Sequence, residues 1–154
     1  MIRFFITPRI KQLQKGQPRF GHCWRECGNI QADHFHIFWD CPVIRPYWLE
    51  VVEQIKAIMG FEIKHDFCTI YLGNISSTIN SSDKYLIKIM LAASEKVLTK
   101  RWLSKEPPTR RDWIGTVREI YNMGKLNLCM AKFSSYWRKW TINLDASAPQ
   151  LDNE

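Results

Sequence analysis

Long segments of the chain carry apolar residues every three or four positions, and short irregular stretches separate them. The first such segment begins after Pro42 and Pro46. Its apolar positions are Tyr47, Trp48, Val51, Val52, Ile55, Ile58 and Met59. This period predicts an amphipathic helix that starts near Pro46, where proline suits the first turn, and ends at Gly60.

A longer segment with the same period follows at 83–103, and Ser82 is a suitable cap for its first turn. Its apolar residues cover a wide arc, which predicts a central helix with neighbours on two sides. Arg101 lies among the apolar positions near the end of this helix. We therefore expect it either to form an ion pair or to reach a partner.

Two more helices are predicted after the Pro107–Pro108 break. Thr109 and Asp112 have the spacing of a capping box, which predicts a helix that pauses at Gly124. A last helical piece at 132–140 places Phe133, Trp137 and Trp140 on one face. By contrast, the short apolar stretch 67–74 is β-prone and predicts a strand or an extended segment.

These elements predict a mainly α fold, in which a small irregular zinc knuckle precedes a bundle-like domain of about four helices. The predicted organisation is a basic linker at 1–22, a zinc-knuckle-like module at 23–45, a helical domain at 46–142 and a disordered tail at 143–154.

The composition supports one compact domain, since 45% of the 154 residues are hydrophobic and 13% are aromatic. No apolar run is long enough to span a bilayer, and the start lacks the apolar region of a signal peptide. We therefore expect an intracellular protein, cytoplasmic or nuclear, without a membrane partner. Thiols are kept reduced there, so the five cysteines fit metal binding better than disulfides.

The net charge of +7 is concentrated in two blocks. Residues 1–27 hold six basic residues and one acidic residue, and residues 84–111 hold eight and two. Such blocks are typical of a surface that binds RNA or another polyanion, although they are also compatible with a solvated surface. The predicted backbone contacts are Arg9, Lys11, Lys15 and Arg19, followed by Lys100, Arg101, Arg110 and Arg111.

The chemistry of the chain is concentrated at 23–41, with the pattern C-x3-C-x8-H-x4-C. Cys23 and Cys27 form one pair, and His36 and Cys41 form the second. Three thiolates and an imidazole are ligands that Zn²⁺ prefers, and four protein ligands leave no open position, so a structural zinc ion is predicted. His34 is a rival ligand to His36, and His22 is a weaker one. The alternative is that these cysteines and histidines are ordinary core residues.

The large hydrophobic residues around the second pair have two interpretations. They are Phe35, Ile37, Phe38 and Trp39, and they either pack the module onto the first helix or stack on bases. Cys68 and Cys129 stand alone on apolar stretches and are predicted to be core residues. His65 has no obvious partner in the sequence.

No catalytic pattern accompanies the cysteine cluster. The chain lacks a P-loop, a G-x-S-x-G elbow and an H-E-x-x-H helix, and its acidic residues do not pair as in two-metal sites. The sequence therefore predicts a protein that is not an enzyme.

The segments "CWRECG" (23–28) and "HIFWDCPVIRPYW" (36–48) resemble the zinc-binding region that follows the polymerase domain in LINE-type non-LTR retrotransposon reverse transcriptases. The similarity extends to "TPRIKQLQKG", "FEIKHDFCTIYLGN", "LIKIMLAASEKVLTKRWLSKEPPT", "DWIGTVREIYNMGKL" and "FSSYWRKW", and so covers nearly the whole chain. The resemblance implies a non-catalytic remnant of such a polyprotein that binds RNA, with Cys23, Cys27, His36 and Cys41 as zinc ligands. A reverse transcriptase domain acting in trans is the partner it implies.

One departure from the family pattern concerns the first cysteine pair, which has three intervening residues instead of two. The added residue is expected to widen the loop and to spoil N–H bonds to the first sulfur, and Glu26 is expected to repel the thiolates. Two other functions stay open. One is a protein-interaction domain with Trp137 and Trp140 as exposed anchors, and the other is a non-functional relic.

Overall fold

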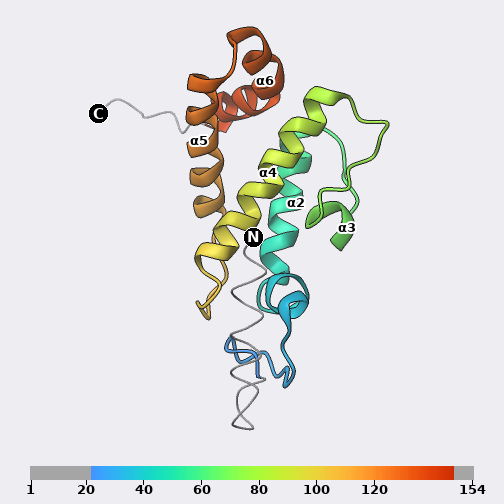
Figure 1. Ribbon diagram of the computed structural model, residues 1–154, viewed down its shortest axis with the longest axis vertical. Helices are drawn as coiled ribbons and strands as arrows, with labels where there is room; N and C mark the ends of the chain where they lie inside the picture. The colour runs from blue at the N-terminus through green and yellow to red at the C-terminus, as the bar shows by residue number, and fades with distance from the viewer. Residues whose placement is uncertain (1–21, 148–154) are drawn as a thin grey trace, which may run out of the picture.

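The computed structural model describes residues 22–147, and it is helical throughout its regular parts (Figure 1). The elements are η1 (His36–Asp40), α2 (Arg45–Met59), α3 (Phe67–Ile70), α4 (Ser81–Lys100), α5 (Arg110–Asn127) and α6 (Met130–Ser147). No strand occurs among the described residues. The predicted mainly α class is confirmed, with four long helices preceded by an irregular segment rich in cysteine and histidine.

Helix α2 begins and ends where the sequence predicts. Pro46 lies in its first turn, where the missing N–H is harmless, and Gly60 ends it in the left-handed conformation with φ of 80°. Tyr47, Trp48 and Ile55 on its apolar face are almost completely buried.

The predicted strand at 67–74 is wrong, because this segment contains the single helical turn α3. Asp66 precedes it, and its carboxylate accepts a hydrogen bond from the backbone N–H of Thr69 at 2.8 Å. A side-chain cap of this kind stabilises a helical turn at its N-terminus. A short apolar run cannot distinguish a strand from a buried helical turn by its period alone.

Helix α4 is the central helix, as its wide apolar arc predicts. It crosses α2 and packs against α2, α5 and α6 (Figure 1). Its cap is Asn80 rather than Ser82, since the Asn80 amide oxygen accepts from the N–H of Asp83 at 2.8 Å.

The capping box of α5 is confirmed, with hydrogen bonds in both directions between Thr109 and Asp112. The helix does not pause at Gly124 but continues to Asn127. A methyl group at Gly124 would lie 3.2 Å from the ring of Phe133, so glycine allows α5 and α6 to approach closely. Helix α6 is longer than predicted and ends at Ser147, within the stretch predicted to be a disordered tail from residue 143.

Tryptophan side chains form much of the core where α2, α4, α5 and α6 meet. Trp113 is buried and donates from its indole nitrogen to the carbonyl of Met90 at 3.0 Å, which joins α5 to α4. Trp137 and Trp140 are 1% and 2% exposed. The prediction that they are exposed anchors for a partner is therefore wrong.

The cysteine-rich segment lies at one end of the molecule, beside the start of α2 and the loop between α4 and α5 (Figure 1). Among residues 22–147, none of the helices combines the length and the hydropathy needed to cross a bilayer.

Replacing Asn80 by Ala is expected to lower the free energy of unfolding by about 1 kcal/mol, because the N–H of Asp83 loses its capping acceptor. Ser82→Ala is the matched control, since the Ser82 hydroxyl contacts only Ser135 at an exposed position. Urea denaturation of the two variants checks the assignment of the cap. An equal or larger loss for Ser82→Ala would contradict it.

Candidate metal centre

Four side chains converge between the irregular segment and the start of α2. The thiols of Cys23, Cys27 and Cys41 and the imidazole of His36 each offer one ligand atom, and these atoms lie within 4.8 Å of one another. Cys23, Cys41 and His36 are buried, and Cys27 is half-buried. The predicted set of four is therefore brought together by the fold.

The distances between the ligand atoms suit a tetrahedral ion. With zinc–sulfur bonds of about 2.3 Å, two sulfurs of a regular tetrahedron are about 3.8 Å apart. The sulfurs of Cys23 and Cys41 are 3.8 Å apart, and Cys27 Sγ lies 3.3 Å from His36 Nε2. Thiolates and imidazole are also the donor set that such an ion prefers.

The first cysteine pair accommodates its additional residue through a left-handed turn. Glu26 has a φ of 59° and Gly28 has a φ of 91°, while the N–H of Glu26 donates to the carbonyl of Cys23 at 3.0 Å. The N–H of Cys23 donates across the loop to the carbonyl of Asn29 at 2.9 Å. The loop is thus closed by backbone hydrogen bonds despite the wider spacing.

One expectation about the widened loop is wrong, and the loss of N–H bonds to the first sulfur stays a prediction. The carboxylate of Glu26 does not lie against the thiols. It is exposed and forms an ion pair with Lys105 in the loop between α4 and α5.

The second ligand pair is held by the π-helical turn η1. The N–H of Cys41 donates to the carbonyl of His36 at 2.9 Å, five residues earlier, which is the hydrogen bond of a π-helix. The His36 ring is further held by a 3.2 Å contact between its Nδ1 and the side-chain amide of Asn29. A local π turn therefore brings both ends of H-x4-C to the same point.

Arg25 is a buried cation beside the cluster, with 5% of its surface exposed. Its guanidinium donates to the carbonyl of Ile37 at 2.8 Å. This carbonyl has no i+5 donor in η1, because residue 42 is proline and lacks an N–H group. Arg25 thus completes the backbone hydrogen bonding of the turn and places positive charge at the thiols. Sequence reasoning missed this role, since an arginine between two cysteines gives no signal that it is buried.

The electrostatics of the site differ between its thiols. Burial, together with the neighbouring Cys27 and Cys41, raises the pKa of the Cys23 thiol to about 12. Burial also opposes ionisation of Cys41, but hydrogen bonds from the N–H of Val43 and from Arg25 outweigh it and lower the pKa of that thiol. Burial, and then the charge of Arg25, lower the pKa of His36, which favours the neutral imidazole that a metal ion requires.

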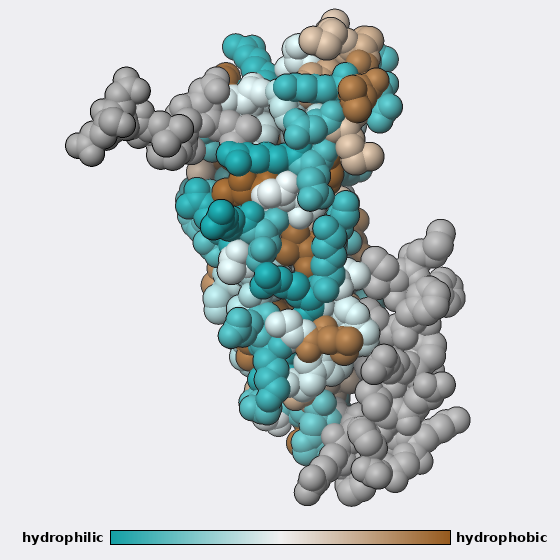
Figure 2. Space-filling view, turned by 90° about the vertical axis from the view of Figure 1, so that its left-hand side faces the viewer, coloured by the Kyte–Doolittle hydropathy of each residue, from teal (hydrophilic) through white to brown (hydrophobic). Residues whose placement is uncertain are grey.

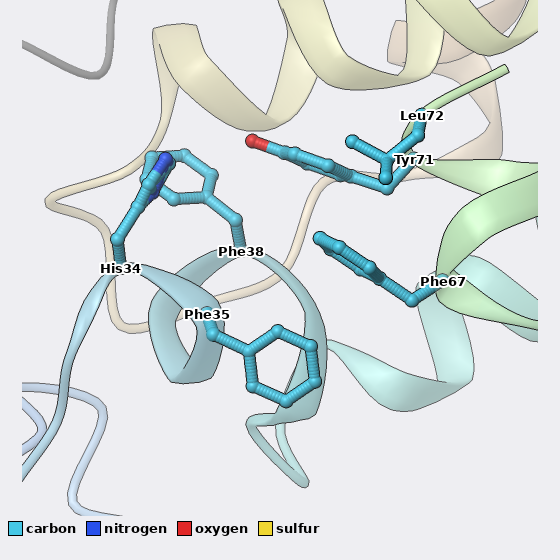
Figure 3. A pocket seen from close by; sticks show the side chains of 6 residues that line it. All are labelled: His34, Phe35, Phe38, Phe67, Tyr71 and Leu72. Atoms are coloured by element: carbon cyan, nitrogen blue, oxygen red, sulfur yellow. The ribbon is translucent and has the colours of Figure 1, made fainter.

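The alternative ligand His34 lies elsewhere. Its ring contacts Phe38 edge to face at 4.7 Å and Tyr71 at 6.4 Å, on the wall of an apolar pocket (Figure 3). His22 is exposed and is not part of the cluster. Of the three histidines considered as ligands, only His36 joins the cysteines.

This apolar pocket lies between the turn around η1 and α3, and it has a volume of about 350 Å³. Its walls are His34, Phe35, Phe38, Phe67, Tyr71 and Leu72 (Figure 3). The rings of Phe67 and Tyr71 stack with centroids 5.1 Å apart.

The large hydrophobic residues around the second ligand pair pack mainly between the cysteine-rich segment and α2. Trp48 of α2 donates from its indole nitrogen to the carbonyl of Phe38 at 2.9 Å, and Trp39 lies against Trp48 with centroids 5.4 Å apart. Ile37 and Phe38 are buried, whereas Phe35 is 45% exposed. The module is therefore joined to α2 by these side chains, as one of the two interpretations predicted.

The remaining cysteines and His65 differ from expectation. Cys68 and Cys129 are exposed, so their prediction as core residues is wrong. His65 is exposed but does have a neighbour, the ring of Trp39 at 5.7 Å. Small apolar segments such as 67–70 give no indication of which single residue faces the solvent.

Of the predicted nucleic-acid contacts, Arg9, Lys11, Lys15 and Arg19 lie outside the described residues. Lys100, Arg101, Arg110 and Arg111 are exposed where the end of α4 meets the start of α5. Arg101 pairs with Asp112 at 3.5 Å, which answers the question its position raised. Arg118 belongs to the same surface and was not predicted.

No family model matches this chain, and no solved structure matches it. The resemblance to the zinc-binding region of LINE-type reverse transcriptases therefore rests on the sequence motifs alone.

The left-handed turn at Glu26 predicts a difference between two substitutions. Glu26→Gly is expected to be more stable than Glu26→Ala by about 1 kcal/mol, because only glycine adopts positive φ without steric cost. Both variants lose the ion pair with Lys105, so its contribution cancels in the comparison. Urea denaturation of both proteins provides the measurement, and equal stabilities would mean that residue 26 is not left-handed.

Proposed function

We propose that the four ligands hold one structural zinc ion and that the chain is a non-catalytic RNA-binding module. The observation that carries the zinc assignment is the convergence of three cysteines and one histidine within 4.8 Å. Soft thiolates favour Zn²⁺ over the hard cations Mg²⁺ and Ca²⁺. Four protein ligands complete the tetrahedron and leave no position for a substrate or a reactive water, which is why the role is structural.

The charge balance of the site supports this assignment. Three thiolates and one neutral imidazole around a divalent ion carry one net negative charge. Arg25 supplies one buried positive charge beside them, and this charge favours the ionised thiolate of Cys41. A buried charge needs such compensation, because an uncompensated ion in the protein interior is strongly unfavourable.

The candidate metal centre is connected directly to the loop between α4 and α5. The indole nitrogen of Trp24, between the first two cysteines, donates to the carbonyl of Trp102 at 2.8 Å, and the two rings meet edge to face at 5.3 Å. Glu26 pairs with Lys105 in the same loop. A zinc ion that fixes the 23–27 loop would thereby also fix the loop that leads into the basic surface.

The basic residues at the start of α5 support binding of a polyanion. Arg110 and Arg111 occupy the first turn, where the helix dipole disfavours positive charge. Among the described residues, neither they nor Arg118 has an acidic partner within 4 Å, whereas Arg101 pairs with Asp112. A bound phosphate backbone would relieve this repulsion, and it would do so independently of base sequence.

The motif resemblance described above indicates the biological setting. We propose that the chain is a remnant of a LINE-type reverse transcriptase that acts inside the cell on RNA, with a polymerase domain in trans as the partner. The alternative of a protein-interaction domain loses its proposed anchors, since Trp137 and Trp140 belong to the core.

Zinc binding is tested by native mass spectrometry of protein purified without chelator. We expect one zinc ion per chain, and we expect Cys41→Ser to lose it because the tetrahedron loses a thiolate. His34→Leu is the matched control and is expected to retain the ion, since His34 lies in the apolar pocket. A folded chain without zinc, or one that loses zinc in the control, would contradict the assignment.

RNA binding is tested by fluorescence anisotropy with a labelled single-stranded oligonucleotide at several salt concentrations. Affinity is expected to fall linearly on a double logarithmic plot. The double variant Arg110→Gln, Arg111→Gln is expected to reduce the slope by about 1.4 if both side chains contact phosphates.

The control for this experiment replaces two exposed basic residues of α6, Lys132→Gln together with Arg138→Gln. It removes the same charge from another part of the surface. Equal effects of the two double variants would indicate a response to net charge alone, and the assignment to α5 would then be wrong.

A further inference from the structure

The packing of residues 22–147 does not explain why α5 carries a glycine at position 115. Gly115 lies in the second turn of the helix, where glycine is less favourable than almost any other residue. A methyl group added at Gly115 would meet no atom of residues 22–147 within 4 Å, so no neighbour in this part of the chain requires its absence. Gly124 in the same helix differs, because Phe133 lies against it.

The surroundings of Gly115 form a shallow groove between α4 and α5. Two adjoining depressions share Gly115 and Arg111 as lining residues. The charged side chains around them are the basic Lys100, Arg101, Arg110, Arg111 and Arg118 and the acidic Asp112 and Glu119. Arg111 and Arg118 lie four residues before and three residues after the glycine, so all three share one face of the helix.

The two acidic residues of this groove differ in their roles. Asp112 accepts hydrogen bonds from the N–H and hydroxyl of Thr109 and pairs with Arg101, so its charge is already compensated. These contacts also lower the pKa of its carboxyl group, beginning with the backbone bond to Thr109. Glu119 is exposed and lines the same depression as Gly115. The five basic side chains around the groove outnumber its two acidic ones, so the field over Gly115 is positive.

We propose that Gly115 is the floor of a phosphodiester-binding groove, with Arg111 and Arg118 on either side of the bound backbone. The inference rests on the proposed RNA binding and locates its closest point of contact. Because Gly115 has no Cβ atom, a phosphate and its sugar can approach the main chain of the helix there. The guanidinium groups of the two arginines then reach the phosphate oxygens. The side of the molecule that carries α5 is mostly hydrophilic, with smaller apolar groups between (Figure 2).

The test uses Gly115→Ala and Gly115→Leu in the full chain. Both replacements favour the helix, so the denaturation midpoint is expected to rise, and zinc content is expected to stay unchanged. Affinity for a labelled oligouridylate is expected to fall by about threefold for Ala and about tenfold or more for Leu, because each side chain holds the backbone further from the arginines. Greater stability combined with weaker binding is the pattern that a merely structural glycine would not give.

Ser134→Ala and Ser134→Leu are the matched controls, since Ser134 is exposed on α6 and does not line the groove. They are expected to stabilise the helix without changing affinity. Two charge variants act in opposite directions, with Arg118→Gln expected to weaken binding and Glu119→Gln expected to strengthen it.

The outcomes separate the two proposals. If the unmodified chain binds no oligonucleotide, the proposed function itself is wrong. If it binds and the Gly115 variants bind equally well, only the groove assignment is overturned. If polyglutamate competes as well as the oligonucleotide at equal charge, the groove recognises an acidic protein segment, which also overturns the phosphodiester assignment.

Discussion

The hydrogen bond from the N–H of Cys41 to the carbonyl of His36 is the constraint on which the candidate metal centre depends. It closes a π turn over five residues and so places an imidazole and a thiol side by side. Pro42 follows at once and cannot donate to the last carbonyls of the turn. The side chains of Arg25 and Trp48 donate to the carbonyls of Ile37 and Phe38 instead.

The two side chains that donate in place of the missing N–H come from different parts of the chain. They therefore join the π turn to two other segments. Arg25 belongs to the first cysteine loop, and Trp48 belongs to α2. Satisfying two backbone carbonyls therefore also fixes the ligand loop and the first helix against the turn. Buried carbonyls without donors would be costly, so the turn, the loop and α2 depend on one another.

The connection continues toward the basic surface. Trp24 and Glu26 contact the loop between α4 and α5 through Trp102 and Lys105. That loop leads into the capping box of α5 and so sets the orientation of the first helical turn. The candidate metal centre and the proposed RNA-binding groove are thus adjacent parts of one packed unit.

Helix α5 combines features that oppose its own stability. Its first turn carries two arginines, whose positive charge is unfavourable at the positive end of the helix dipole. Its second turn contains Gly115, and glycine has the lowest helix propensity of any residue except proline. The capping box and the buried Trp113 stabilise the same helix. A helix that combines destabilising surface residues with strong stabilising contacts is expected where its surface is adapted to bind a ligand.

The long helices and the composition of the candidate ligand set follow from signals that are local in the sequence. The period of the apolar residues and the positions of proline and glycine predicted α2, and the Thr109–Asp112 pair predicted the start of α5. These signals could be recognised because they act between residues that are close in the chain. The spacing of Cys23, Cys27 and Cys41 likewise indicated a metal site. The cap at Asn80 and the helical turn at 67–70 were missed, since neighbouring polar or apolar residues offered competing solutions of similar energy.

The burial of individual side chains, and the choice between the candidate histidines, depend on how distant segments pack. His36 was the predicted ligand and His34, two residues earlier, was its rival. The π turn directs His36 to the thiols, while His34 lines the apolar pocket. Burial of Arg25 and Trp137 and exposure of Cys68 depend on contacts between distant segments. Burial is a property of the packed whole, and a local pattern contains no information about the neighbours that exclude water.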